Sequence, residues 1–201
     1  LEAADISAAF ADYASAGYDV VIGHGYEFGD PALEVAETYP ATKFICTESD
    51  ASSDNVASYV MACEQTAYVE GIIAASMTKS DKLGAIGPIQ GDSLVKIVNG
   101  YEDGAKSVNP DIEVQTAWTN SFVDTQLAQE AAKAMIENGV DVIKHCANAC
   151  GNGAIAAAVD ADIWCQGDSY DQSSLAPENI LDSAIYNLDV VIDKAIESVV
   201  D

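Results

Sequence analysis

Short apolar runs bounded by glycine, proline or polar residues alternate along this chain with longer segments whose apolar residues recur every three or four positions. The short runs predict buried strands, and the longer segments predict amphipathic helices. Predicted strands cover residues 18–23, 43–47, 55–59, 83–87, 112–118, 140–145, 163–166 and 180–185, and predicted helices cover 1–16, 31–38, 62–78, 92–107, 124–138, 152–159 and 187–200. Strands that alternate with helices of this length predict an α/β fold with parallel sheets and right-handed crossovers.

The order of these elements divides the chain into two predicted lobes. The series restarts near residue 80, so we expect an N-terminal lobe at residues 1–80 and a C-terminal lobe at 81–186, with 187–201 returning to the first. The first lobe opens on a helix without the strand that normally precedes one, so we expect this lobe to be truncated. The helix at 62–78 carries small residues that permit close packing on a neighbour, namely Ala67, Gly71, Ala74 and Ala75.

The most informative segment is 19–31, where an apolar run ends in Gly-His-Gly and two aromatic residues follow. Ligands of open α/β sheets bind outside the carboxyl ends of the strands, so the rings of Tyr26 and Phe28 are candidates for ligand contact. Asp30 is predicted to cap the next helix, with Pro31 at its first position. The alternative for either ring is packing beneath that helix.

The net charge of the chain argues against some classes of binding partner. The 201 residues include 33 acidic side chains and eight basic ones, for a formal net charge of −25. Such a surface repels phosphate backbones and anionic lipid headgroups, which argues against nucleic-acid binding and direct membrane adsorption. No apolar run approaches the roughly 20 residues of a membrane-spanning helix. The N-terminus lacks a signal-type block, so we expect targeting information to be absent or removed.

Residues typical of metal binding or catalysis are sparse. The five cysteines form no paired CxxC pattern, so we expect buried free thiols and no metal site. They are Cys46, Cys63, Cys146, Cys150 and Cys165, and a bridge between Cys146 and Cys165 is the minor alternative. His24 and His145 end predicted strands, where a structural hydrogen-bonding role is favoured over a catalytic one. The chain has no nucleophile elbow, P-loop or zinc-protease motif.

Polar and aromatic residues follow the predicted strands as a group. They are Glu48, Gln90, Asn120, Phe122, Asp124, Asn148, Asp168, Tyr170 and Asp171. Aromatic rings that sandwich a flat ring, with carboxylates and amides that bind hydroxyl groups, suit a sugar or a nucleoside. All eight basic residues are lysine, and the lack of arginine favours a neutral ligand over a phosphorylated one. Gly151 and Gly153, at a predicted helix start, add a weak anion-binding signal.

Six segments resemble the basic membrane protein family, and they occur in order over nearly the whole chain. They are Gly-His-Gly-Tyr-Glu-Phe-Gly-Asp-Pro (23–31), Tyr-Pro-Ala-Thr-Lys-Phe (39–44), Asn-Val-Ala-Ser (55–58), Gly-Tyr-Glu-Asp-Gly-Ala-Lys-Ser-Val-Asn-Pro (100–110), Gly-Asn-Gly (151–153) and Asp-Gln-Ser-Ser-Leu-Ala-Pro (171–177). Members are extracytoplasmic lipoproteins that bind purine and other nucleosides for ABC importers. The resemblance implies a type I periplasmic-binding fold, with two α/β lobes around a hinged cleft.

The resemblance also implies roles for single residues. Phe122, in a Ser-Phe-x-Asp segment, is implied to stack on the base, and Glu48, where the family usually has aspartate, to reach ribose hydroxyls or a base edge. For the ribose, Asp168 is the first choice and Asp171 the second. Tyr186 stands where the family usually has lysine, which implies a changed ligand preference. The family's N-terminal segment, which helps to line the pocket, has no counterpart here.

We therefore predict a solute-binding protein rather than an enzyme, without a cofactor, whose ligand is a nucleoside and most consistently a purine nucleoside. The ligand is expected between the lobes, and the candidate contacts are Tyr26, Phe28, Glu48, Phe122, Asn148, Gly151, Asp168 and Asp171. The expected partner is an ABC permease, and the expected location is extracytoplasmic, with a lipid anchor outside this segment. Two alternatives stay open: a sugar or signalling-molecule binder of the same fold, and a cytosolic α/β enzyme acting on nucleosides.

Overall fold

The structure, a computed structural model, describes residues 3–200, which fall into two compact units. Unit 1 is the chain up to Met61 together with the segment from Asn187 onward, and unit 2 is Ala62–Tyr186. Each unit contains one sheet of parallel strands with helices packed on it, so the predicted α/β fold class is confirmed.

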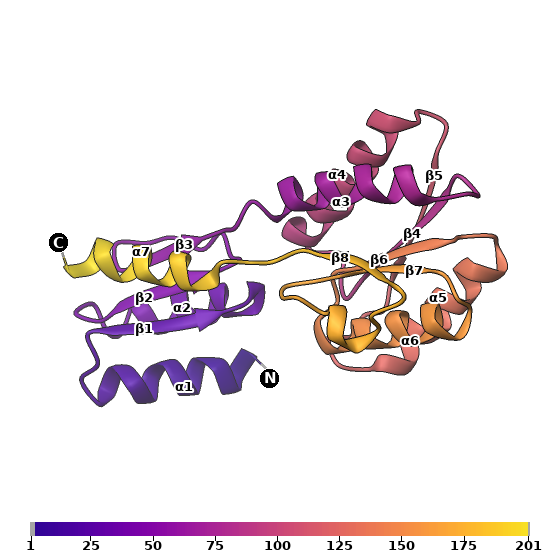
Figure 1. Cartoon of the computed structure of the whole chain (residues 1–201). Helices are drawn as coiled ribbons and strands as arrows, with labels where there is room; N and C mark the ends of the chain where they lie inside the picture. Colours follow the sequence, from indigo (N-terminus) through magenta and orange to yellow (C-terminus); the bar gives the residue numbers. More distant parts are fainter. Residues whose placement is uncertain (1–2, 201) are drawn as a thin grey trace. The chain divides into compact units, whose positions relative to one another are not determined.

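Unit 1 is built on a three-stranded sheet in the order β1-β2-β3. Its elements are α1 (Ala3–Ser15), β1 (Val20–His24), the 3-10 turn η1 (Tyr26–Phe28), α2 (Gly29–Ala36), β2 (Lys43–Thr47), β3 (Val56–Tyr59) and α7 (Leu188–Val200). Apolar side chains of α1 and α2 share one core with Phe44 of β2. Helix α7 lies beside β3 (Figure 1), where the hydroxyl oxygens of Tyr59 and Ser198 are 2.7 Å apart.

The start of α2 differs from the sequence prediction. Asp30 was expected to be its N-cap, but the helix begins at Gly29 and its N-cap position is Phe28, without a side-chain hydrogen bond. The turn η1 runs directly into α2, so the chain is already helical before Asp30. Pro31 still lies in the first turn, where a missing backbone N–H costs no intrahelical hydrogen bond.

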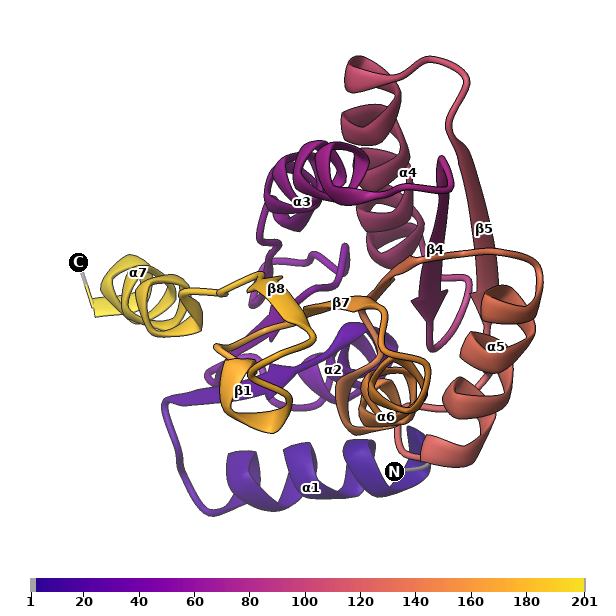
Figure 2. The same cartoon turned by 45° about the vertical axis from the view of Figure 1, so that its right-hand side comes forward.

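Unit 2 is built on a five-stranded sheet in the order β5-β4-β6-β7-β8. Its elements are α3 (Cys63–Met77), β4 (Lys82–Gly87), α4 (Asp92–Val108), β5 (Glu113–Trp118), α5 (Thr125–Glu137), β6 (Val142–His145), η2 (Asn148–Gly151), α6 (Asn152–Asp160), β7 (Trp164–Gly167), η3 (Ser173–Leu175) and β8 (Ile180–Ser183). Helices α3 and α4 cover one face of this sheet, and α5 and α6 cover the other (Figure 2). The strand order changes direction at β4, because β5 lies on one side of it and β6 on the other.

Helix α3 belongs to unit 2, whereas the sequence placed residues up to 80 in the first lobe. Its small residues allow backbone contact with α4, as the sequence predicted. A Cβ atom at Gly71 would lie 2.1 Å from the carbonyl oxygen of Tyr101, and one at Gly104 would lie 1.9 Å from that of Tyr68. This close packing holds α3 to α4, so the boundary between the units falls at Met61–Ala62 instead of near residue 80.

The pairing of β6 with β7 argues against the disulfide considered from sequence. Cys165 lies opposite Ile143 in the register, so it shares a sheet face with Ile143. Cys146 is three residues beyond Ile143 and therefore points to the opposite face. The structure shows Cys146 and Cys165 as buried thiols that are not joined to each other, and the other three cysteines are also buried.

Candidate functional site

The carboxyl ends of the parallel strands of unit 2 meet at one edge of the sheet, and this edge carries unusual backbone geometry. Asn120, Asn148 and Ser169 follow β5, β6 and β7 and have positive φ angles of 55°, 46° and 69°. Two further positive values in unit 2, 56° at Asp81 and 53° at Asp162, occur before β4 and β7. Non-glycine residues in this region are strained, and such strain clusters at binding and active sites. Open α/β sheets bind ligands at this edge, where the strand order reverses. The edge is therefore the candidate ligand site of unit 2.

Asp168 directly follows β7, and its carboxylate is held by two hydroxyl groups. The Tyr186 hydroxyl donates to Asp168 Oδ1 at 2.7 Å, and the Ser169 hydroxyl donates to Oδ2 at 2.9 Å. The residue as a whole is only 5% exposed. A carboxylate has about four lone-pair positions, so two remain for other donors. Asp168 is thus a fixed, partly satisfied acceptor at the end of the strand.

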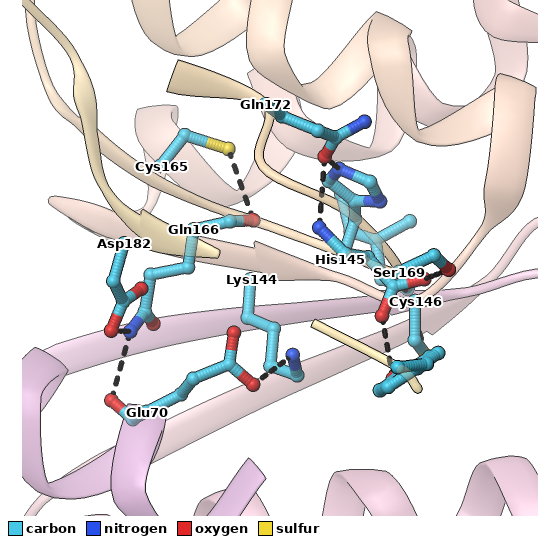
Figure 3. Close-up of polar contacts among 12 residues, drawn as sticks. Glu70, Lys144, His145, Cys146, Cys165, Gln166, Ser169, Gln172 and Asp182 are labelled. Carbon is cyan, nitrogen blue, oxygen red and sulfur yellow. Dashed lines mark hydrogen bonds and ion pairs between the residues drawn. The ribbon is translucent and has the colours of Figure 1, made fainter. Parts of the chain in front are cut away.

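Gln172 fixes the backbone behind Asp168. The backbone N–H of Asp168 donates to Gln172 Oε1 at 2.8 Å, and the backbone N–H of Gln172 donates to the hydroxyl of Ser183 at 3.1 Å. His145 Nε2 lies 3.0 Å from the same Gln172 oxygen (Figure 3). Because that oxygen only accepts, Nε2 must carry the imidazole proton. One side chain therefore joins the ends of β6, β7 and β8.

His145 is buried and neutral rather than poised for catalysis. Burial lowers the pKa of its imidazole below the ordinary value, although the Asp168 carboxylate opposes the shift. Its second ring nitrogen, Nδ1, has no hydrogen-bond partner among the described residues. The ring packs against Gly151, where an added Cβ atom would lie 2.0 Å from Nδ1. Gly151 therefore serves to make room for the histidine ring.

Phe122 and Asn148 lie on connections that are tied to each other. Phe122 is half-buried between β5 and α5, and its carbonyl oxygen accepts a hydrogen bond from the backbone N–H of Cys150 at 3.1 Å. Asn148 begins η2, two residues before that cysteine, and its side chain is exposed. The structure thus brings the segment of Phe122 next to the segment of Asn148 and Gly151.

Asp171 is exposed and has a local role. Its carboxylate accepts from the backbone N–H of Ser173 at 2.9 Å, at the start of η3. Hydrogen bonds from the side chain and the backbone of Ser173 lower the pKa of Asp171. Between the two aspartates considered for a ligand hydroxyl, Asp168 has the more rigid surroundings.

The candidates in unit 1 differ in their packing. Tyr26, in η1, is 49% exposed, whereas Phe28 packs against the core with its ring centroid 5.9 Å from that of Phe10. Glu48 follows β2 with a φ of 60°, and its Oε1 accepts from the backbone N–H of Met61 at 3.1 Å. The packing gives Phe28 a structural role. Glu48 has a positive φ after a strand of unit 1, as the three strand-end residues of unit 2 do.

The residue before His145 on β6 belongs to a buried ion pair. Lys144 pairs with Glu70 of α3, and the two side chains are 2% and 3% exposed. Gln166 Nε2 donates to the Glu70 carbonyl oxygen at 2.9 Å and to Asp182 Oδ2 at 3.3 Å (Figure 3). These contacts join α3 to β6, β7 and β8 on one face of the sheet.

Burial and charge attraction oppose each other in this cluster, and the outcome differs between its two charged residues. It raises the pKa of Glu70 to about 7, against the attraction of Lys144 and with added repulsion from Asp182 and Asp168. Burial also disfavours the charged form of Lys144, but attraction to Glu70 and Asp168 outweighs it and leaves the lysine pKa raised. Lys144 therefore stays charged, while Glu70 titrates near neutral pH.

Sequence reasoning did not assign roles to Gln172, Glu70 or Lys144. A signal was present for the ion pair, because Lys144 interrupts an apolar strand and Glu70 sits among the small residues of α3. Charged residues in such surroundings are rare unless they are paired. For Gln172, nothing in local spacing distinguished a buried brace from a solvated loop residue.

Other candidate sites are poorly supported in the described part of the chain. Residues 3–200 hold no group of three or more His, Cys, Asp or Glu side chains arranged to bind a metal ion. Within the same range, no helix has both the length and the apolar character needed to cross a bilayer. Two shallow hollows, of about 470 and 420 Å³, lie on α1–α2 and on α6 and are lined by none of the predicted ligand contacts.

Comparison with known proteins places this geometry in context. Residues 1–201 match the sequence model of a family described as ABC transporter substrate-binding protein PnrA-like. A purine-binding protein of Brucella abortus is 33% identical over 184 residues, which are 92% of this chain and 52% of the relative. A candidate ABC transporter glucose-binding protein of Haloferax volcanii is 30% identical over 183 residues, which are 91% of this chain and 46% of that relative.

A solved structure agrees with the fold over nearly the whole chain. The crystal structure of a solute-binding protein of an ABC transporter system from Aeropyrum pernix superposes with a TM-score of 0.89 at 26% identity. The alignment covers 99% of this chain and 59% of that structure. The chain spans about half the length of the curated relatives it matches.

Proposed function

This chain belongs to the PnrA-like family of ABC transporter substrate-binding proteins, and from that premise we propose that it binds an uncharged purine nucleoside for import. The observation that carries the proposal is the row of strained strand ends in unit 2, where Asn120, Asn148 and Ser169 all have positive φ. Such strain persists only where the surrounding structure enforces it, and binding sites are where it concentrates.

The residues at this edge match the parts of a nucleoside. Phe122 supplies an aromatic face for the base, because it is half-buried and anchored by the hydrogen bond from Cys150 to its carbonyl oxygen. Asp168 supplies a fixed acceptor for ribose hydroxyls, and Asn148 an exposed amide beside the Phe122 segment. The name of the Brucella abortus relative, a purine-binding protein, supports a purine base.

Charge favours a ligand without phosphate. The chain carries a net charge of −25 and no arginine. Lys144, which lies near this edge on β6, is already ion-paired with Glu70. A nucleotide would bring two or more negative charges toward the Asp168 carboxylate, which would repel them. The proposed ligand is therefore a nucleoside and not its phosphate.

The proposed role is capture and delivery, not catalysis. His145 is neutral, buried and bonded to Gln172, so it is not placed to act as a general acid or base toward a ligand. We propose an ABC permease as partner and an extracytoplasmic location with a lipid anchor, as the family resemblance implies. Incubation with inosine should return the nucleoside unchanged by chromatography, and release of free hypoxanthine would favour the enzyme alternative.

A sugar ligand is the second candidate, because the Haloferax volcanii relative is named for glucose. The acceptors at the edge suit sugar hydroxyls equally well, so the aromatic contact decides between the two. A nucleoside needs the ring of Phe122 for its base, whereas a sugar can bind through Asp168 and Asn148 alone.

Isothermal titration of the protein in its full natural length tests the proposal. We expect binding heat with inosine, guanosine or adenosine and none with the corresponding monophosphates. Replacing Phe122→Ala should weaken the nucleoside about 5- to 150-fold, because stacking of a base on an aromatic side chain is worth about 1–3 kcal/mol.

The matched control is Tyr68→Ala, which removes a partly exposed ring from α3, on one face of the same unit. We expect this variant to bind as the wild type does. No heat with any nucleoside would reject the proposal. Binding of glucose or ribose that is insensitive to Phe122→Ala would support the sugar candidate instead.

A further inference from the structure

The buried ion pair between α3 and β6 belongs to a larger polar cluster that contains too few hydrogen-bond donors. Three buried oxygens of this cluster accept no hydrogen bond from the described residues, namely Glu70 Oε1, Gln166 Oε1 and Asp182 Oδ1. Glu70 is 3% exposed and Gln166 is fully buried. Buried polar atoms of folded proteins are almost always hydrogen-bonded, because an unpaired one has lost its contact with water. The cluster therefore requires a hydrogen that no neighbouring side chain supplies.

The geometry brings the two carboxyl groups of the cluster to the same amide. Gln166 lies opposite Lys144 in the register of β7 and β6, and its Nε2 donates both to the Glu70 carbonyl oxygen and to Asp182 Oδ2 (Figure 3). Lys144 pairs with the other carboxyl oxygen of Glu70. One positive charge thus meets two carboxyl groups. A single proton on these groups makes the cluster neutral and converts one of its acceptors into a donor.

The other titratable groups around Glu70 do not change their protonation near neutral pH. Those within electrostatic range of Glu70 are Lys144 and Cys146 from β6 and its end, Cys165 from β7, Asp168 after β7, Asp182 from β8 and Tyr101 from α4, and Asp141 acts on Tyr101. Burial raises the pKa of both thiols to about 12. Burial, with repulsion from Glu70, also raises the pKa of the Tyr101 hydroxyl, so all three groups stay protonated. His145 points to the opposite face of the sheet from Lys144.

The two carboxyl groups of the cluster are the groups that can take up a proton. Burial raises the pKa of Glu70 to about 7, against the attraction of Lys144 and with added repulsion from Asp182. Burial also raises the pKa of Asp182, against the hydrogen bond from Gln166 and the attraction of Lys144. Because each carboxylate repels the other, the two groups titrate as a pair.

We propose that Glu70 and Asp182 hold one proton between them, and that this buried proton site attaches α3 to the sheet and lets α3 separate from it when the proton leaves. With the proton bound, the cluster is neutral and gains a donor. Without it, an excess negative charge and three unpaired acceptors are buried, and entry of water between α3 and the strands relieves both. Glu70 makes the side-chain contact with Lys144 and the backbone contact with Gln166, so the opening occurs at this residue. The inference does not depend on the identity of the ligand.

Amide hydrogen exchange on the protein in its full natural length, followed by mass spectrometry, measures the opening. The pKa of Glu70 is about 7 in the closed state and 4.5 once the side chain is in water, so the opening equilibrium increases about tenfold between pH 6 and pH 8. After correction for the intrinsic effect of pH on exchange, we expect α3 to lose about tenfold in protection. Helix α5, on the opposite face of the sheet, should change little. Equal losses in α3 and α5 would indicate global unfolding and overturn the proposed local opening.

Glu70→Gln removes the titrating group and should make the protection of α3 nearly independent of pH. The matched control is Glu102→Gln, which breaks an ion pair of the same type with Lys106 on the exposed side of α4. This control should keep the tenfold change. If Glu70→Gln keeps it as well, the opening is not governed by Glu70 and the proposal is wrong.

Carbon-13 NMR of the glutamate carboxyl groups detects the proton directly. We expect one glutamate signal with a midpoint near pH 7, and its absence in Glu70→Gln assigns it. Asp182→Asn removes a charge that raises the pKa of Glu70, so the midpoint should move to lower pH. This second variant keeps the test decisive even if Glu70→Gln does not fold. The proton site is ruled out if every glutamate titrates near its ordinary value, or if Asp182→Asn leaves the midpoint unchanged.

Discussion

Replacing Glu70 by glutamine tests the electrostatics of the buried cluster directly. The substitution removes the charge but keeps the shape and an oxygen that can accept from Lys144. Burial raises the pKa of Glu70 from 4.5 to about 7 in the folded protein. Because the folded-state pKa lies above the unfolded value, the native state holds a proton that the unfolded chain releases between about pH 4.5 and 7.

The sign of the effect follows from proton linkage. A raised pKa contributes stability that is fully present below pH 4.5 and is lost as the pH rises through 7. Glutamine does not titrate, and the other carboxylates contribute to both proteins, so the difference between the two proteins reports Glu70 together with its ion-pair partner Lys144. A pKa difference of this size changes the free energy of unfolding by about 2–3 kcal/mol between pH 5 and pH 8. We expect the free energy of unfolding of Glu70→Gln to rise by that amount relative to the wild type between pH 5 and pH 8.

Urea unfolding at several pH values measures the difference. Trp118 and Trp164 are the chain's two tryptophans, and both lie in unit 2, so their fluorescence reports the unit that contains Glu70. Glu137→Gln, at an exposed carboxylate at the end of α5, is the matched control and should show a much flatter difference with pH. The reasoning is refuted if the wild type gains stability relative to Glu70→Gln as the pH rises, because the ion pair would then outweigh the cost of burial.

Two further predictions concern packing and the thiols. Gly151→Ala should destabilise unit 2 by about 2 kcal/mol or more in urea, because the new Cβ would lie 2.0 Å from His145 Nδ1. Gly91→Ala is the control, since its nearest neighbour would be 3.8 Å away, and equal losses at the two positions would contradict the packing argument. Burial raises the pKa of Cys146 and of Cys165 to about 12, so at pH 8 both should react with a thiol reagent far more slowly in the native protein than in urea. Rapid native labelling of either cysteine, located by peptide mass spectrometry, would show that it is not buried.

The alternation of strands and helices was predictable from the sequence alone, and so was the sheet edge at which several candidate ligand contacts lie. Apolar periodicity depends only on the local chain, and it identified the strands of both sheets to within a few residues. Because parallel strands end at a common edge, Phe122, Asn148 and Asp168 could be assigned to that edge without coordinates. The small residues of α3 likewise predicted close packing of this helix on a neighbour.

The tertiary structure alone decided which side chains meet, because those contacts join residues far apart in the chain. Glu70 and Lys144 are 74 positions apart, and no periodic pattern pairs them. The same holds for Tyr186 with Asp168, and for Phe28, whose ring packs against the core of unit 1. Periodicity tells which residues face inward, but the partner, the hydrogen bond and the desolvation cost depend on how strands and helices are arranged in space.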